Sequence, residues 1–158
     1  IATVVHQPKL LILDEPFSGL DPINTNLIKE EIRNLHEGGT SIIFSTHRME
    51  QVEEICENIL LINQGKVLLT GSVNEVKNQF KLNHFEIGYA GELPVDFSNQ
   101  CDVVEKLNNK VVVKLPDGMS PSALLKMAVQ TGVDIRSWNE MLPSLNEIFI
   151  RQVANNHG

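Results

Sequence analysis

The hydrophobic pattern in the first third of the chain predicts strands and helices in alternation. Residues 10–13 form a short apolar run that is typical of a strand buried on both faces of a parallel sheet. Apolar positions within 22–37 recur at the spacing of one helical face, and a pair of glycines ends that pattern. A β-rich run at 40–46 and an amphipathic segment at 49–56 follow. This order indicates an α/β fold with a parallel sheet and helical crossovers.

The pattern changes in the middle of the chain, where short β runs and turn residues predominate. Residues 58–62 and 66–70 flank a glycine turn and predict a hairpin, and a capping box then predicts a short helix over 73–81. The later predicted strands are 85–90, 103–107, 110–115 and 134–138, and the later helices begin at Ser120 and Ser144. We therefore expect part of an α/β domain over 1–81 and a small α+β domain over 84–155.

Composition and charge argue against several classes of protein. The chain has 158 residues of which 42% are hydrophobic, which is enough for a core and argues against disorder. Its formal net charge is −7 and no basic patch is visible, so no nucleic-acid partner is expected. The two cysteines form no C-x-x-C motif, so neither a zinc site nor a disulfide framework is expected. No apolar run approaches the roughly 18 residues that span a bilayer.

An acidic doublet follows the first apolar run directly. Ligands in open α/β sheets gather at the carboxyl ends of strands, where Asp14 and Glu15 are expected. Asp14 is a candidate Mg²⁺ ligand, through a water, because Mg²⁺ keeps much of its hydration shell. Glu15 is a candidate for polarising the water that attacks a terminal phosphate. An isolated acidic pair is more simply a solvated loop, but the longer string hhhhDEPxSGLD argues against that interpretation.

His47 ends the second β-rich run, directly before a predicted helix. If the two strands are neighbours, His47 lies at the same sheet edge as Asp14. A histidine there can donate a hydrogen bond to a phosphate oxygen and help to hold the water. A lone histidine is more often a surface or core residue, but its place at a strand end favours a function.

The segment Ser18-Gly19-Leu20-Asp21 lies between the acidic doublet and the first helix. Serine and glycine are ordinary turn residues, and an aspartate before Pro22 is suited to cap a helix. These structural roles do not exclude a functional one.

Together these motifs resemble those of the ATP-binding cassette (ABC) ATPases. Asp14 and Glu15 resemble the Walker B motif and the catalytic glutamate of that family. Residues 18–21 resemble its D-loop, and His47 resembles its switch histidine. The motifs occur in family order and at suitable spacing, and the resemblance covers residues 1 to about 81.

The resemblance implies an assembly and a location. Two copies of such a subunit sandwich two ATP molecules with Mg²⁺ and drive a membrane permease from the cytoplasmic face of the membrane. It also implies that Ser18, Gly19 and Asp21 contact the nucleotide, in addition to Asp14. Residues 143–149 resemble the C-terminal extension of bacterial exporter-type subunits, so export is expected.

Several motifs of the family do not occur in the chain. The phosphate-binding loop Gly-x-x-x-x-Gly-Lys-Ser/Thr, the glutamine loop and the Leu-Ser-Gly-Gly-Gln signature are absent. The sole Gly-Lys pair, Gly65-Lys66, has Leu60 where the first glycine belongs. We therefore expect a C-terminal portion of a longer subunit that alone binds ATP weakly or not at all and is inactive.

Two alternatives remain open at this point. ATPases of DNA repair or chromosome maintenance share these motifs, but they usually carry coiled-coil or zinc insertions and basic surfaces, which this sequence does not show. The region 84–155 is a candidate non-catalytic module for regulation or dimerisation, or else a passive packing domain.

Overall fold

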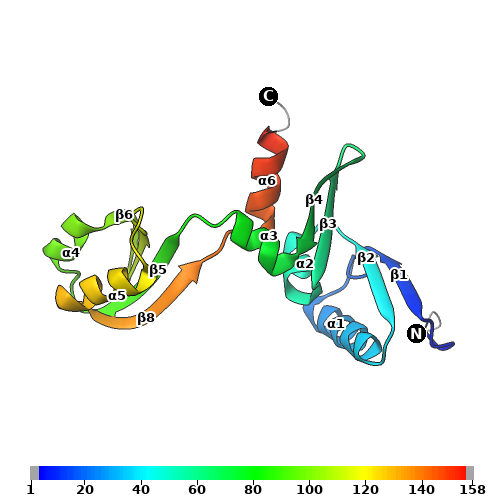
Figure 1. Ribbon diagram of the computed structural model, residues 1–158. Helices are drawn as coiled ribbons and strands as arrows, with labels where there is room; N and C mark the ends of the chain where they lie inside the picture. The colour runs from blue at the N-terminus through cyan, green and yellow to red at the C-terminus, as the bar shows by residue number, and fades with distance from the viewer. Residues whose placement is uncertain (1–3, 156–158) are drawn as a thin grey trace. The chain divides into compact units, whose positions relative to one another are not determined.

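The computed structural model describes residues 4–155 and divides into two compact units (Figure 1). Unit 1 runs through Val73 and resumes at Ser144, and unit 2 is Asn74–Pro143. The chain therefore leaves unit 1, forms unit 2, and returns to unit 1 with its last helix.

These units differ from the predicted division into 1–81 and 84–155. The last helix, which we expect in the second domain, packs in unit 1, and the boundary lies at residue 73. A capping box and an apolar face predict that a helix forms, but they do not predict what it packs against. The units are defined by contacts alone, and the domain division 1–81 and 84–155 stays a prediction.

Unit 1 begins with the order of elements that the sequence predicts. The elements are β1 (Leu10–Asp14), α1 (Pro22–Glu37), β2 (Ser41–Ser45) and α2 (Met49–Ile55). Strands β1 and β2 are parallel neighbours, with Leu10 opposite Ser41 and Asp14 opposite Ser45. The two strands therefore end together at one edge of the sheet.

Local sequence explains where α1 begins and ends. The Asp21 carboxylate accepts hydrogen bonds from the backbone N–H groups of Ile23 (2.9 Å) and Asn24 (3.1 Å). It thereby satisfies donors that the first turn leaves unpaired, and Pro22 is suited to that turn because it has no N–H to satisfy. After the helix, Gly39 has a φ of 94°, a conformation that strongly favours glycine.

The burial predicted for the first strand is wrong on one face. Leu11 is buried, but Ile12 is 69% exposed and its register partner Ile43 is 58% exposed. An apolar strand is covered on both faces only when crossover helices lie on both sides of the sheet. Within residues 4–155 the face that carries Ile12 and Ile43 is thus left largely exposed.

The predicted hairpin is confirmed. Strands β3 (Asn58–Asn63) and β4 (Lys66–Ser72) pair antiparallel. Gln64 and Gly65 between them have φ values of 49° and 73°, as a two-residue turn that fits the twist of a hairpin requires. Helix α3 (Val73–Gln79) follows.

The last helix, α6 (Leu145–Asn155), begins with the predicted capping box. The Ser144 backbone N–H donates to Glu147 Oε2 (2.7 Å), and the Glu147 N–H donates to Ser144 Oγ (3.2 Å). The two residues thus satisfy each other's unpaired backbone donors.

After α3, unit 2 consists of a four-stranded antiparallel sheet with two helices. Its elements are β5 (His84–Ala90), α4 (Val95–Gln100), β6 (Asp102–Leu107), β7 (Lys110–Lys114), α5 (Pro121–Gln130) and β8 (Asp134–Met141). The spatial strand order is β6-β7-β5-β8. The element order β-α-β-β-α-β is that of the ferredoxin-like split βαβ arrangement. The α/β class of the first part and the α+β class of the second are therefore as predicted.

The core of unit 2 is closed by its own residues. Ile87 and Val111 on the sheet, Phe97 on α4 and Leu124 on α5 are all fully buried. Helix α4 is absent from the predictions because it has six residues and no side-chain cap at Pro94, so its sequence shows no helical period. His84, the first residue of β5, is paired with Met141, the last residue of β8.

The two cysteines are free, and burial raises the pKa of both the Cys56 and Cys101 thiols to about 11. Both are therefore protonated at neutral pH. Over residues 4–155, no helix has the length and apolar character needed to cross a membrane.

Candidate active site

The carboxyl ends of β1 and β2 place the first acidic residue beside a hydroxyl group. Asp14 and Ser45 are register partners, and Ser45 Oγ donates a hydrogen bond to Asp14 Oδ1. The next residue turns away from the strand, because Glu15 has a φ of 46° and its N–H donates to the Ser45 carbonyl (2.9 Å). The doublet therefore points in two directions, one carboxylate along the strand end and one toward the loop after β2.

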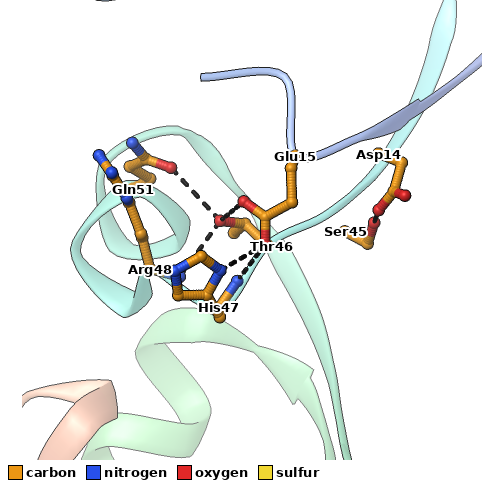
Figure 2. Close-up of polar contacts among 7 residues, drawn as sticks. All are labelled: Asp14, Glu15, Ser45, Thr46, His47, Arg48 and Gln51. Atoms are coloured by element: carbon orange, nitrogen blue, oxygen red, sulfur yellow. Dashed lines mark hydrogen bonds and ion pairs between the residues drawn. The ribbon is translucent and has the colours of Figure 1, made fainter. Parts of the chain in front are cut away.

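The Glu15 carboxylate binds the loop that contains His47 (Figure 2). Its Oε1 accepts from the His47 backbone N–H (2.9 Å) and lies 2.6 Å from His47 Nδ1, while Oε2 accepts from Thr46 Oγ1 (3.0 Å). Glu15 is a non-glycine residue in the left-handed region, which is sparsely populated and is kept only where surrounding contacts hold it. The structure thus brings His47 into contact with the acidic doublet, through Glu15 rather than Asp14.

These contacts determine the charge of Glu15. The hydrogen bond with the His47 side chain lowers the pKa of Glu15 most, and the His47 N–H and Thr46 hydroxyl lower it further. Desolvation opposes them, but the net direction is downward. Glu15 is therefore ionised at neutral pH and acts as a hydrogen-bond acceptor.

Thr46 and Gln51, which are not among the predicted site residues, also support this loop. Thr46 Oγ1 accepts from the Arg48 N–H (3.1 Å) and lies 3.4 Å from Oε1 of Gln51 (Figure 2). Gln51 is a buried polar residue on α2. The signal that could have identified it is its polarity at a buried helical position, because buried polar groups need partners.

The turn after the doublet is anchored to the same residue. The Ser18 N–H donates to the Glu15 carbonyl (3.0 Å), and Gly19 has a φ of 74°. Phe17 is almost fully buried and packs edge-on against Phe44, with ring centroids 5.8 Å apart. Asp21 caps α1, and hydrogen bonds from Asn24 lower its pKa. Within the described residues, Ser18, Gly19 and Asp21 make no contact with His47 or the Glu15 carboxylate, so their predicted nucleotide contacts stay predictions.

The oxygen donors at the predicted Mg²⁺ site are few. Asp14 and Ser45 offer a carboxylate and a hydroxyl oxygen, and Mg²⁺ is commonly held by one or two carboxylates together with waters and substrate phosphates. Over residues 4–155 no group of three His, Cys, Asp or Glu side chains gathers as a protein-only metal site. The residues present therefore fit an ion that is bound through waters and phosphates.

Two families match the chain over separate segments. ATP-binding protein DrrA1-3-like, C-terminal domain, matches residues 71–153, and the AAA domain family matches residues 1–52. The second match contains the doublet and His47.

Relatives of known sequence agree with these matches. An ABC transporter ATP-binding protein of Alkalihalophilus pseudofirmus is 38% identical over 157 residues, which are 98% of this chain and 58% of that protein. The ABC transporter ATP-binding protein YhaQ of Bacillus subtilis is 39% identical over 98% of this chain and 52% of that protein. The chain thus spans about half the length of the curated relatives that it matches.

A solved structure is similar to part of the chain. CbiO1 of Clostridium perfringens, described as part of the ABC transporter complex CbiONQ, is 38% identical over 48% of this chain and 31% of that chain, with a TM-score of 0.42. The chain belongs to the ABC transporter ATP-binding proteins that carry a DrrA1-3-like C-terminal domain. The family suggested by the motifs is thereby confirmed.

Proposed function

We propose that this chain is the C-terminal portion of an ATP-hydrolysing subunit that couples hydrolysis to transport through a membrane permease, in the direction of export. The observation that carries the proposal is the contact between Glu15 and His47 at the ends of two parallel strands. This contact joins a candidate base to a candidate phosphate sensor.

Glu15 polarises the attacking water in this proposal. A carboxylate has about four acceptor positions. Both acceptor positions of Oε1 are occupied by His47, through its backbone N–H and its Nδ1. Oε2 accepts one hydrogen bond, from Thr46, so its second acceptor position is available for a water. The Glu15 side chain is 32% exposed, which lets water reach it. Its ionised state and its constrained φ mean that the acceptor is charged and oriented before the nucleotide binds.

His47 senses the terminal phosphate. Its Nδ1 lies on Glu15, and the ring is 78% exposed, so that Nε2 is accessible to a ligand. A ring that donates Nδ1–H to Glu15 and Nε2–H to a phosphate oxygen must be the doubly protonated imidazolium. That positive charge would stabilise the negative charge on the phosphate during transfer.

Asp14 holds Mg²⁺ through a water, next to the Ser45 hydroxyl. When bound, Mg²⁺ neutralises charge on the phosphate oxygens. Ser18, Gly19 and Asp21 complete the nucleotide contacts through a turn that Glu15 anchors at its carbonyl. The phosphate-binding loop and the signature are supplied from outside this chain.

The proposed assembly is based on analogy with the family. We propose a homodimer of the complete subunit, bound to the cytoplasmic face of the membrane through a permease and with no nucleic-acid partner. The names of the relatives support the transporter over a DNA-repair ATPase. Export is proposed by analogy with the exporter-type subunits whose C-terminal extension residues 143–149 resemble.

The test is Glu15→Gln in the complete subunit. We expect ATP turnover to fall by at least about 100-fold while ATP binding is kept, because glutamine has nearly the same shape but cannot act as a base. Steady-state hydrolysis and nucleotide titration measure the two effects. Glu92→Gln, at an exposed glutamate of unit 2, is the matched control. Unchanged hydrolysis in Glu15→Gln would refute the role of Glu15.

A further inference from the structure

The loop that carries His47 continues directly into a helix that α6 contacts. Helix α2 begins at Met49, two residues after His47. Helices α2 and α6 pack against each other within unit 1, although the whole of unit 2 separates them in sequence (Figure 1). The position of α2, and with it the position of the His47 loop, therefore depends on a helix near the C-terminus.

One polar contact fixes this packing at the start of α6. The Leu145 backbone N–H donates to Glu53 Oε1 of α2 (2.6 Å). The first N–H groups of a helix have no partner within the helix, and a carboxylate is a strong acceptor for them because of its charge. Ser144 and Glu53 thus share the task of capping α6, one from its own chain segment and one from α2.

Apolar side chains of α2 and α6 also border one cavity. Leu145 and Ile148 of α6 are buried, with 4% and 1% of their surface exposed. They line a cavity of about 520 Å³ together with Val52 of α2 and His47 itself. The switch histidine and the C-terminal helix therefore border one cavity.

The other side of α2 is held by α1. The neighbouring glutamate, Glu54, forms an ion pair with the buried Lys29 of α1, and Arg33 lies 3.6 Å from the same carboxylate. Adjacent glutamates thus connect α2 to two different helices, Glu54 to α1 and Glu53 to α6. Loss of the Glu53 contact removes this polar link between α2 and α6, while the Glu54 link to α1 remains.

We propose that α6 positions the Glu15–His47 pair, with Glu53 as the positioning residue that joins α6 to α2. The proposal rests on the proposed function for its effect on catalysis. The claim that α6 keeps the His47 loop ordered can be tested without measuring hydrolysis. Because the chain reaches α6 only by way of unit 2, the small domain is linked to the site through this helix.

The test compares three variants of the complete subunit. In Glu53→Ala we expect kcat to fall about five- to tenfold with the KM for ATP unchanged, because the pair is misplaced while the phosphate-binding loop outside this chain keeps its contacts with the nucleotide. In Glu53→Gln the amide oxygen still accepts from Leu145, so kcat is expected within about twofold of the parent. Glu50→Ala, at an exposed glutamate of the same helix, is the matched control and should match the parent.

Hydrogen–deuterium exchange of the peptide that contains His47 supplies a readout independent of activity. The His47 N–H donates to Glu15, so Glu53→Ala should accelerate its exchange while peptides of β7 in unit 2 exchange as before. An unchanged exchange rate at His47, or a Glu53→Gln variant as impaired as Glu53→Ala, overturns the proposal. If Glu15→Gln retains hydrolysis, the proposed function fails, and the exchange measurement still decides the role of α6.

Discussion

The two units of the chain differ in where their apolar side chains lie. In unit 2, Ile87 and Leu124 are fully buried in a core made by a four-stranded sheet and its helices. In unit 1, Ile12 and Ile43 on one face of the β1–β2 pair are more than half exposed, and the polar contacts gather at the strand ends. Unit 2 thus buries its core among its own residues, whereas unit 1 combines the candidate site with a sheet face that is largely exposed within the described residues.

The largest test of this comparison is nucleotide binding by the 158-residue chain alone. A Kd of 1 μM corresponds to about 8.2 kcal/mol of binding free energy. The strand-end site of unit 1 lacks the backbone N–H groups and the lysine of a phosphate-binding loop, so most of that free energy should be missing. We expect isothermal titration with Mg·ATP to show weak binding or none. Micromolar affinity would show that the 158-residue chain is sufficient for binding and would overturn this expectation.

The second test concerns packing. Phe97→Ala in unit 2 removes a fully buried ring, and such changes cost about 3–5 kcal/mol of unfolding free energy. Ile12→Ala in unit 1 removes an exposed side chain and should cost less than about 1 kcal/mol. The single tryptophan, Trp138, packs on Phe85 with ring centroids 5.2 Å apart, so its fluorescence reports urea unfolding of unit 2.

Hydrogen exchange of the β1 amides reports the effect of the Ile12 change. Similar losses of unfolding free energy for Phe97→Ala and Ile12→Ala would contradict the difference in packing between the two units.

The smallest expected effect is the dependence of the His47 loop on pH. The pKa of Glu15 is lowered below its ordinary value of 4.5, so the contact stabilises the fold fully above pH 4.5 and is lost as pH falls through the lowered pKa. NMR of the His47 amide should show its hydrogen bond intact at pH 5 to 7 and breaking only in stronger acid. A loop that loosens already near pH 6 would contradict the direction of this shift.

Local signals in the sequence predicted much of the fold. The Asp21 cap, the turn at Gly65 and the Ser144–Glu147 capping box all lie where short-range chemistry places them. Each depends on residues within four positions of one another, which a single sequence displays directly. The same holds for the strand ends that place the acidic doublet and His47.

Long-range packing could not be predicted in the same way. The exposure of Ile12 depends on which helices cover the sheet, and the contact between Leu145 and Glu53 joins residues 92 positions apart. At the site, the sequence indicated that His47 approaches the doublet. It did not indicate that the turned backbone of Glu15 makes this carboxylate, rather than that of Asp14, the partner.

The pairing of His84 with Met141 has a consequence for how the small domain could be exchanged. Its entry and exit strands are hydrogen-bonded neighbours, which puts their Cα atoms about 5 Å apart. A segment with such close ends can be excised and replaced by a short loop, or by another domain with equally close ends, without stretching the chain on either side. Residues 84–141 therefore begin and end at paired neighbouring positions, which suits them to be exchanged as one segment.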